Sequence, residues 1–340
     1  MKYISFVVPS YNAENYLNKC IDSLLLGGDD VEIIIVNDGS KDKTIDIANE
    51  YLEKYPNIIR VIDKENGGHG SGINAGLEIA TGLYYKCVDS DDWVDKNAYK
   101  TLLETVKEHY QQNTCPDLYF MNYVYERLDI NLQVPMRDKY MPKNKIFTWK
   151  EMKKFGLTEY LFLHQTMFKL SVIKESGMKL PHHCFYVDNV FVHIPLYYVK
   201  TMYYCNVDFY RYYVGRPNQS VTLENVGKNY KMSIKVMNEI SSSHTLKELK
   251  SLHKNQYRYL IHDIMAKEVL TLFHVNAVHN KEKDNHLKMY WKHFKETNKE
   301  LYKKIKYKTP YFFITLLIPP LRRKAVLFGY KQLIKKTKWN

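Results

Sequence analysis

The sequence predicts an α/β fold, with a mostly parallel central sheet followed by a helical C-terminal region. In the first hundred residues, short apolar runs alternate with helical patterns, an order typical of parallel strands joined by helices. Several of these apolar runs end abruptly in polar side chains. After about residue 221 the chain is rich in lysine and has helical patterns without strand signals.

The first hundred residues are expected to hold four strands, at 4–8, 32–36, 58–62 and 83–88. Helices are expected between them at 13–26, 43–54 and 72–80, with Asn12 as the cap of the first. Further strands are expected at 117–124, 165–170 and 202–213, around a helix at 188–199. The 340 residues suffice for a main domain and a smaller helical part, which we divide between residues 220 and 221, where no linker marks the boundary.

The positive charge is concentrated near the end of the chain. The net charge is +13, and residues 281–340 hold 17 Lys/Arg against 4 Asp/Glu, so the remainder is neutral. This distribution argues against a catalytic domain that embraces nucleic acid and predicts a basic tail that meets an anionic surface. A merely solvated, lysine-rich helix is the alternative.

An apolar stretch within this tail, residues 311–321, has about half the length needed to span a bilayer. We expect residues 308–340 to lie in the interface of an anionic membrane. Basic residues flank the apolar stretch on both sides: Lys303, Lys304, Lys306, Lys308, Arg322, Arg323 and Lys324.

The five cysteines are widely spaced and include no Cys-x-x-Cys pair, which predicts reduced thiols and neither a disulfide framework nor a zinc site. The N-terminus enters a strand directly, without a charged-then-apolar leader, so we expect no signal peptide. The expected location is the cytoplasm, at the inner face of the cell membrane.

Polar residues follow the first two predicted strands. Tyr11 and Glu14 come after the first and Asp38 after the second, at the sheet edge where open α/β sheets bind ligands. Tyr11 could stack on a base, and Asp38 could accept hydrogen bonds from a base or ribose. For Tyr11 the alternative is an ordinary strand-to-helix turn, and for Asp38 it is a helix cap.

A glycine-rich stretch at residues 67–72 precedes the third expected helix. A dinucleotide-binding fingerprint belongs after the first strand of a sheet, with an acid about 20 residues further on. Because this stretch follows the third strand, we reject that interpretation and expect only backbone amides that face phosphates.

The fourth strand ends in Asp89, Asp91 and Asp92, three carboxylates within four residues. Acids so close repel one another unless a cation shares them. Asp89 and Asp91 alternate across the strand end and together could hold Mg²⁺ or Mn²⁺ against a diphosphate, since hard cations prefer oxygen ligands. The alternative is a helix N-terminus that favours acids, with Asp92 as a cap.

Taken in order, these residues resemble the family 2 glycosyltransferases, nucleotide-sugar enzymes of the GT-A fold. The resemblance covers about residues 1–125 and rests on five segments in the same order. They are Pro9-Ser10-Tyr11-Asn12, Val36-Asn37-Asp38-Gly39-Ser40, Asn66-Gly67-Gly68 to Asn74-Ala75-Gly76-Leu77, Ala80-Thr81-Gly82 and Asp89-Ser90-Asp91-Asp92-Trp93.

The resemblance implies a mixed, mostly parallel sheet, with a nucleotide-sugar half at 1–125 and an acceptor half at 126–220. It implies that Asp89-Ser90-Asp91 is the family's Asp-x-Asp site, with Asp91 as the direct metal ligand and Asp89 beside it. It further implies a nucleotide pocket lined by Pro9, Tyr11, Glu14, Asp38 and Asn66.

One position departs from the family pattern. Many members have an arginine immediately before the asparagine that corresponds to Asn74, and this chain has Ile73. A cationic contact to the nucleotide would then come from Lys64 or His69. For His69, a turn residue bonded to backbone is the alternative.

The acceptor-side base is expected at Asp188, because residues 185–191 resemble the family's Glu-Asp position, with Val187 in place of the first acid. Apolar neighbours would raise the pKa of Asp188 and suit it to take a proton. A helix cap is the alternative. Arg211 or Arg216 could form a lid over the diphosphate, or belong to a strand and a surface loop.

We therefore predict a metal-dependent inverting glycosyltransferase, a hexosyl- or N-acetylhexosaminyltransferase that moves a sugar from a UDP-sugar to a glycan hydroxyl. Inversion and the UDP preference follow from the resemblance alone. The expected acceptor is a lipid-linked oligosaccharide in capsule, exopolysaccharide or envelope glycan synthesis; a protein-bound glycan or a teichoic acid would also suit.

Two other classes stay open. A nucleotidyltransferase could use the same acids, but the glycine-rich triphosphate loop expected after the first strand is absent from the sequence. A noncatalytic protein could bind nucleic acid or membrane through the tail, but acids at the sheet edge would repel phosphate unless a metal is present.

Overall fold

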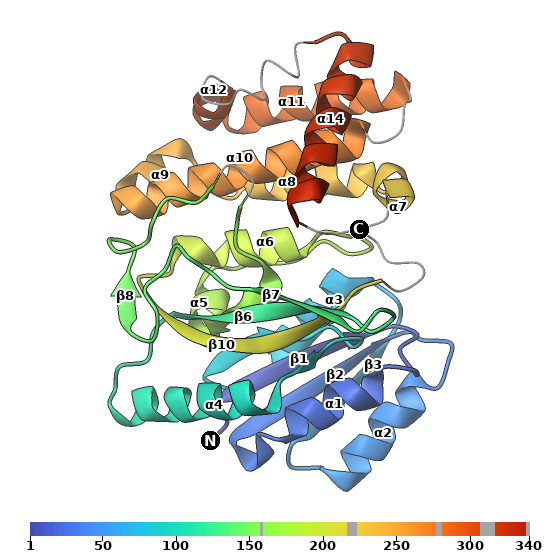
Figure 1. Ribbon diagram of the computed structural model, residues 1–340, viewed down its shortest axis with the longest axis vertical. Helices are drawn as coiled ribbons and strands as arrows, with labels where there is room; N and C mark the ends of the chain where they lie inside the picture. Colours follow the sequence, from blue (N-terminus) through green and yellow to red (C-terminus); the bar gives the residue numbers. More distant parts are fainter. Residues whose placement is uncertain (157–158, 216–222, 277–280, 307–316, 338–340) are drawn as a thin grey trace. The chain divides into compact units, whose positions relative to one another are not determined.

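The computed structural model describes residues 1–156, 159–215, 223–276, 281–306 and 317–337 (Figure 1). The chain forms two compact units. The first consists of residues 1–154 and 161–217, and the second of residues 155–160 and 218–340. The division of function between residues 1–220 and 221–340 remains a prediction.

The first unit is built on one mixed sheet, with the strand order β3-β2-β1-β4-β9-β6-β10-β5. The first four strands of the chain are parallel to one another: β1 (Ile4–Ser10), β2 (Val31–Asp38), β3 (Ile59–Lys64) and β4 (Tyr84–Cys87). The helices that follow β1, β2 and β3 are α1 (Leu17–Leu25), α2 (Thr44–Lys54) and α3 (His69–Ile79).

The other half of the sheet is mixed. β9 (Thr166–Lys169) runs antiparallel between β4 and β6 (Leu118–Arg127), and β10 (Thr201–Tyr213) lies parallel to β6. Short strands complete the edges: β5 (Trp93–Val94), β7 (Leu132–Met136) and β8 (Ile146–Thr148). The helices of this half are α4 (Lys96–Gln111), α5 (Leu170–Glu175) and α6 (Asp188–His193), with single 3₁₀ turns η2 (Leu163–Gln165) and η3 (Pro195–Tyr197). A further 3₁₀ turn, η1 (Gly28–Asp30), precedes β2.

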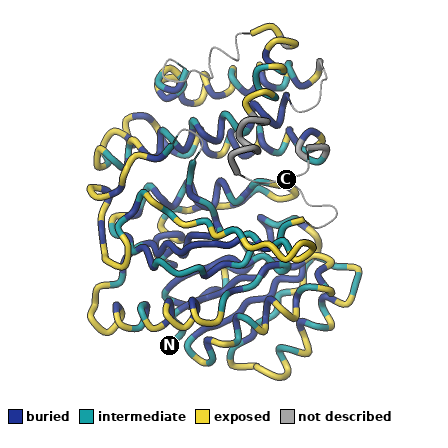
Figure 2. Tube along the Cα trace, in the orientation of Figure 1, coloured by how far each residue is buried: buried dark blue, intermediate teal, exposed yellow. Residues whose placement is uncertain are grey.

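Alternation of side chains along β1 explains the two layers of helices (Figure 1). Phe6 and Val8 point into the apolar core that α1, α2 and α4 cover. Val7 faces α3 on the opposite side, so closely that a Cβ atom on Gly76 would lie 2.3 Å from Cγ1 of Val7. Both faces of the central strands are therefore buried, as Figure 2 shows.

The second unit is helical in its described residues. Its helices are α7 (Leu223–Lys228), α8 (Tyr230–Ser242), α9 (Leu246–Ser251), α10 (Lys254–Asn276), α11 (Lys281–Thr297), α12 (Lys299–Lys306) and α14 (Pro319–Thr337). Val326 and Leu327 of α14 pack against Phe273 of α10. Across the described parts of the chain, none of the helices combines the length and the apolar character needed to cross a bilayer.

The α/β class, the mixed and mostly parallel sheet and the helical C-terminal region are as the sequence predicts. Four local predictions were wrong. β1 continues to Ser10, the first helix begins at Leu17, and Asn12 has a φ of 50° and does not cap that helix. The third helix begins at His69, so much of the glycine-rich stretch is helical.

Candidate active site

The strand order reverses its direction between β1 and β4. The chain moves from β1 to β2 and β3 on one side and then returns to place β4 on the other side of β1. The connection after β1 leads towards β2 and the connection after β4 leads towards β6, in opposite directions along the strand order. In open α/β sheets, ligands bind in the crevice at such a switch point. The predicted site residues after these strands lie at this edge.

The loops after β1 and β2 are joined by hydrogen bonds. The backbone N–H of Asn12 donates to Oγ of Ser40 at 3.0 Å, and Oε2 of Glu14 accepts from the N–H of Lys43 at 3.1 Å. These contacts support the exposed Tyr11, whose side chain is free of the core. Glu14 is thus placed as a structural link, and its role towards a nucleotide remains a prediction.

Asp38 is buried and holds the loop that follows β3. Its Oδ1 accepts from Nζ of Lys64 at 2.7 Å and from the N–H of Gly67 at 2.9 Å, and its Oδ2 accepts from the N–H of Gly68 at 2.7 Å. Nδ2 of Asn66 donates to the backbone oxygen of Asp38 at 2.8 Å. The structure thus brings Asp38 and Asn66 together, and Lys64, one of the two proposed cationic contacts, is paired with Asp38.

The acids after β4 lie in a turn and not on the strand, because β4 ends at Cys87 and the N–H of Asp92 donates to the backbone oxygen of Asp89 at 2.9 Å. The expected alternation of Asp89 and Asp91 across the strand end was therefore wrong. Asp92 does not cap the next helix either: Asp95 does, by accepting from the N–H groups of Asn97 and Ala98.

Asp92 is instead held from β10. The hydroxyl of Tyr210 donates to Oδ2 of Asp92 at 2.7 Å, and the N–H of Tyr213 donates to Oδ1 at 2.8 Å. Burial, together with the charges of Asp91 and Asp89, raises the pKa of the Asp92 carboxyl well above its ordinary value. Asp92 therefore serves as an anchor of the turn.

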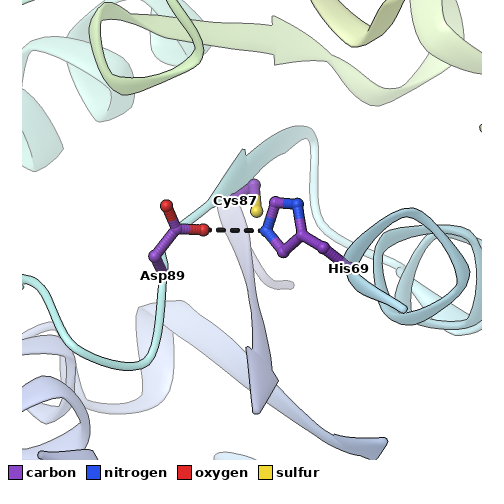
Figure 3. Close-up of side chains that lie close together, drawn as sticks. All are labelled: His69, Cys87 and Asp89. Carbon is purple, nitrogen blue, oxygen red and sulfur yellow. Dashed lines mark hydrogen bonds and ion pairs between the residues drawn. The ribbon is translucent and has the colours of Figure 1, made fainter. Parts of the chain in front are cut away.

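Asp89 faces two histidines, and Figure 3 shows one of them, His69. Nε2 of His69, the first residue of α3, lies 2.9 Å from Oδ1 of Asp89, and Nε2 of His164 in η2 lies 3.7 Å from Oδ2. Burial alone would raise the pKa of the Asp89 carboxyl, but the charges and hydrogen bonds of His69 and His164 outweigh it and hold that pKa below its ordinary value. His69, the other proposed cationic contact, is thus engaged with the acid turn.

Two groups of side chains could hold a metal ion among the described residues. One consists of His69, Cys87 and Asp89, and the other of Asp89, Asp92 and His164. Asp89 belongs to both groups, and its carboxylate suits Mn²⁺ or Mg²⁺, whereas imidazole and thiolate ligands suit softer transition metals. Asp91 belongs to neither group, and its assignment as the direct ligand remains a prediction; Ser90 lies between the two acids in the same turn.

Aromatic rings form the wall beside this turn. The ring of His164 stacks on Tyr212 with centroids 4.4 Å apart, and it lies 4.8 Å from the ring of Tyr210. Behind them lies Lys86, a wholly buried residue of β4. Burial lowers the pKa of the Lys86 ammonium to about 7.

Asp188, the expected base, comes from a distant part of the chain. It is the first residue of α6 and not its cap, which is Val187. Burial raises the pKa of the Tyr212 hydroxyl, and so do the charges of Asp92, Asp89, Asp91 and Asp188. The expected base and the acid turn therefore lie within electrostatic reach of one hydroxyl group.

The loop before Asp188 is fixed to the glycine-rich segment. The N–H of His183 donates to the backbone oxygen of Gly67 at 2.6 Å, and a Cβ atom on Gly68, whose φ is +81°, would lie 3.1 Å from Cα of His183. Asn74 donates to and accepts from the backbone of Leu180. Gly67, Gly68 and Asn74, which all belong to the segments of the sequence resemblance, thus position the acceptor-side loop. Ile73 is buried and supplies no cation.

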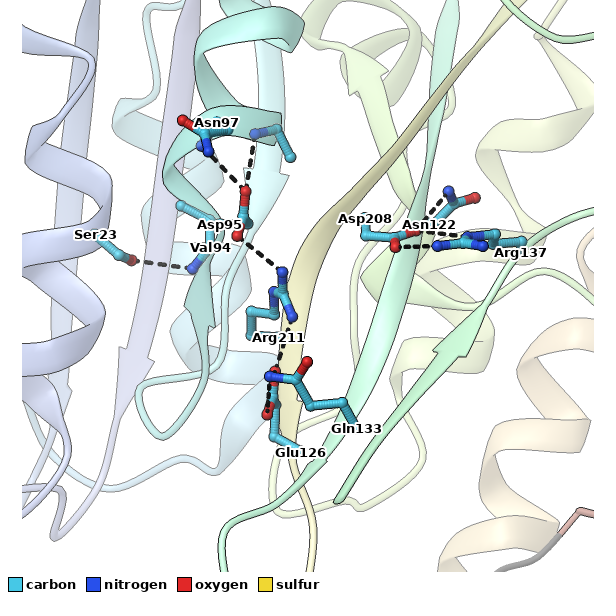
Figure 4. Close-up of polar contacts among 11 residues, drawn as sticks. Ser23, Val94, Asp95, Asn97, Asn122, Glu126, Gln133, Arg137, Asp208 and Arg211 are labelled. Carbon is cyan, nitrogen blue, oxygen red and sulfur yellow. Dashed lines mark hydrogen bonds and ion pairs between the residues drawn. The ribbon is translucent and has the colours of Figure 1, made fainter. Parts of the chain in front are cut away.

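Arg211 has a structural role (Figure 4). Its guanidinium donates to Asp95 Oδ2 at 2.8 Å and to Glu126 Oε1 at 3.0 Å, and so links α4 and β6 to β10. The suggestion that Arg211 forms a lid was therefore wrong, and the alternative of a strand arginine was correct. Arg216 lies outside the described residues.

Sequence reasoning missed the supporting residues Lys86, His164 and Tyr210. Tyr210 lies in the strand expected at 202–213, directly before Arg211. The available signal for His164 was its position directly before the strand expected at 165–170, which the structure places antiparallel beside β4.

Residues 5–171 match the family model described as glycosyl transferase family 2. This part of the chain belongs to that family, as its motifs predicted. The chain is 30% identical over 217 residues to the putative glycosyltransferase EpsH of Bacillus subtilis (strain 168), and this match covers 58% of this chain and 60% of EpsH. It is 32% identical over 185 residues to the poly(ribitol-phosphate) beta-glucosyltransferase of Bacillus spizizenii, which covers 53% of this chain and 27% of that one.

The chain thus spans less than two thirds of the length of these relatives. Among solved structures, S. aureus TarS 1–349 in complex with UDP-GlcNAc superimposes with a TM-score of 0.61 at 18% identity, over 91% of this chain and 92% of that one. This likeness shows a common fold.

Proposed function

We propose that this protein is a metal-dependent inverting glycosyltransferase that moves a sugar from a UDP-sugar to a hydroxyl group of a glycan acceptor. One observation carries the proposal: the N–H of His183, in the loop that leads to Asp188, donates to the backbone oxygen of Gly67 at 2.6 Å, and His69 of the same glycine-rich segment lies 2.9 Å from Asp89. The loop of the expected base and the acid turn are thus fixed to one segment. A donor-side acid cluster and a separate acceptor-side base are the two parts that sugar transfer to a hydroxyl needs.

On the donor side, Asp89 and Asp91 would hold a divalent cation, with His69 and His164 beside Asp89. Such a cation supplies neutralisation of the charge that develops on the leaving diphosphate. The exposed ring of Tyr11 offers a stacking surface for the base at the end of β1. The UDP-GlcNAc bound to TarS supports UDP as the nucleotide.

On the acceptor side, a carboxylate oxygen of Asp188 takes the proton of the attacking hydroxyl. General-base help of this kind contributes about 10²- to 10⁴-fold to the rate. Attack from the face opposite the diphosphate inverts the anomeric centre. Asp188 then lies on the acceptor side of the sugar, and Asp89 and Asp91 lie on the side of the leaving diphosphate.

We place the acceptor among the glycans of the bacterial envelope. The poly(ribitol-phosphate) beta-glucosyltransferase of Bacillus spizizenii and the minor teichoic acid biosynthesis protein GgaB of Bacillus subtilis are among the relatives, which supports such a polymer or its lipid-linked precursor.

The membrane-surface tail remains part of the proposal in a narrower form. Ile318, Leu321 and Phe328 are exposed apolar side chains at the described end of the chain, on or next to the basic helix α14. Arg322, however, is buried and bonds to Asn276 and Asp284, so it is not free to meet lipid. Lys308 and most of the apolar stretch at 311–321 lie outside the described residues.

A nucleotide-sugar screen tests the proposal directly. Thermal unfolding would be followed with UDP-, GDP- and dTDP-sugars, each with and without Mn²⁺. A ligand at 100 times its dissociation constant stabilises a protein by about 2.7 kcal/mol, so a selective donor should raise Tm by several degrees only with the metal. Equal Tm values for all nucleotide sugars would contradict the proposal.

A further inference from the structure

Lys86 is a lysine in the middle of a buried strand, with no exposed surface. Its Nζ donates to three backbone oxygens, those of Leu163 at 2.9 Å, His164 at 2.8 Å and Thr166 at 3.1 Å. These three bonds satisfy the three N–H donors of an ammonium group. All three acceptors belong to η2 and the residue that follows it, so a single side chain fixes this turn to β4.

Volume alone does not account for a lysine at this position, because an apolar side chain could fill the same space in the strand. Such a side chain would leave the backbone oxygens of Leu163, His164 and Thr166 without this donor. The ammonium adds a fixed geometry, because its three convergent hydrogen bonds hold η2 in a single position relative to β4.

The turn that Lys86 fixes carries His164. Nε2 of His164 lies 3.7 Å from Oδ2 of Asp89, and its ring stacks on Tyr212. The same ammonium lies 5.0 Å from the ring centroid of Tyr210, whose hydroxyl accepts from the N–H of Asp89 at 3.1 Å. Lys86 thus contacts the turn that carries His164 and the ring of Tyr210, the two residues that lie against Asp89.

We propose that Lys86 is a positioning residue, which fixes His164 beside Asp89 and through it sets the affinity of the site for a nucleoside diphosphate with its divalent cation. This inference rests on the proposed function. It assigns His164 to the donor site and gives the buried lysine a role that acts through that histidine.

The test is a double-mutant cycle on UDP binding, measured by isothermal titration calorimetry in Mn²⁺ with the full chain. Residues that support a metal or phosphate site from behind typically cost 10- to 100-fold in affinity when replaced. Lys86→Met and His164→Ala should each weaken UDP binding by about 10- to 100-fold. The double variant should bind UDP as weakly as His164→Ala alone, because residues that act through one contact are not additive.

Lys283→Met is the matched control. Lys283 is also buried, donates to the backbone oxygen of Gly227 at 2.7 Å and lies 4.5 Å from the ring centroid of Tyr230, all within the helical unit. Its replacement should leave UDP affinity unchanged. Lys86→Gln, which keeps an N–H donor, replaces Lys86→Met if the latter does not fold by circular dichroism, and should lose less affinity.

The possible outcomes distinguish an error in the role of Lys86 from an error in the proposed function. If the wild-type protein binds UDP and Lys86→Met binds it equally well, the role of Lys86 is wrong while the proposed function stands. Additive losses in the double variant, or normal UDP binding by His164→Ala, overturn the link through His164. Failure of the wild-type protein to bind UDP, GDP or dTDP overturns both the proposed function and this inference.

Discussion

The hydroxyl group of Tyr210 donates a 2.7 Å hydrogen bond to Oδ2 of Asp92, across 118 residues of sequence. The same hydroxyl accepts from the N–H of Asp89, so one buried oxygen joins the beginning and the end of the acid turn. The position of the candidate metal site is thus set from β10 as well as from β4.

Tyr210→Phe should destabilise the protein and weaken the site, because it leaves the buried N–H of Asp89 and a carboxylate oxygen of Asp92 each short of one partner. An unmade hydrogen bond of this kind costs about 1–3 kcal/mol. Urea unfolding should show that loss, and donor turnover should fall by about 10-fold or more. Tyr51→Phe is the control, since its hydroxyl bonds to Asp22 at an exposed site; equal effects of both substitutions would contradict the anchoring role.

Asp188→Asn should separate binding from transfer. The amide keeps the size of the side chain but cannot accept the proton of the acceptor hydroxyl, so kcat should fall by about 10²- to 10⁴-fold. Donor affinity, measured by calorimetry, should stay within about twofold because Asp188 is on the acceptor side. An unchanged kcat would place the base elsewhere.

The membrane-surface hypothesis is best tested by substitution, because truncation at residue 308 would remove the buried Arg322 from Asp284. Leu321→Ser with Phe328→Ser removes two exposed side chains from α14. Burying each is worth about 1.5–3 kcal/mol, so binding to vesicles with anionic lipid should weaken at least about 10-fold in a sedimentation assay. Met289→Ser is the control, because Met289 is an equally exposed apolar residue of α11. Undiminished vesicle binding by the double variant would contradict the hypothesis of a membrane-surface tail.

Glu268 gives the helical unit a pH-dependent stability. Burial raises the pKa of its carboxyl to about 8, while Tyr290 donates to its Oε1. The native state thus keeps a proton that the unfolded state releases near pH 4.5. Its contribution is fully present below about pH 4.5, declines as the pH rises, and is lost above about pH 8, for a total of about 3–5 kcal/mol.

Glu268→Gln should flatten the decline in the free energy of unfolding between pH 5 and pH 8. The comparison with wild type matters because burial lowers the pKa of His274 to about 3, and this group contributes stability that rises with pH up to about 6.5. His274 is present in both proteins and cancels. Parallel pH profiles for the two proteins would show that Glu268 is ionised in the native state.

The sequence was sufficient where the pattern is local. Apolar runs that end in acids predicted β2 and β4 and placed Asp38 and Asp89 at one sheet edge, because parallel strands bring their carboxyl ends together. It failed at Asn12, since a polar residue before a helical pattern looks like a cap, whereas here β1 runs on to Ser10 and Asn12 bonds to the next loop.

The residues that support the acid turn, Lys86 and Tyr210, could not be predicted from the sequence for a different reason. Lys86 bonds to backbone oxygens 77 to 80 residues away, and Tyr210 bonds to Asp92 from another strand. These contacts depend on β9 lying beside β4 and on β10 lying beside β6, an order that periodicity does not encode. A buried lysine in an apolar strand was nevertheless a visible signal that the strand has a polar partner.

The most direct test of the central claim is the Mn²⁺ dependence of donor turnover, measured as UDP release from the UDP-sugar that binds best. We expect wild-type protein to release UDP with Mn²⁺ and to lose this activity with EDTA, while Asp89→Asn and Asp91→Ala each lose at least about 100-fold in the presence of the metal. Full Mn²⁺-dependent turnover in both variants would contradict a metal site at the acid turn, and with it the account of this protein as a metal-dependent glycosyltransferase.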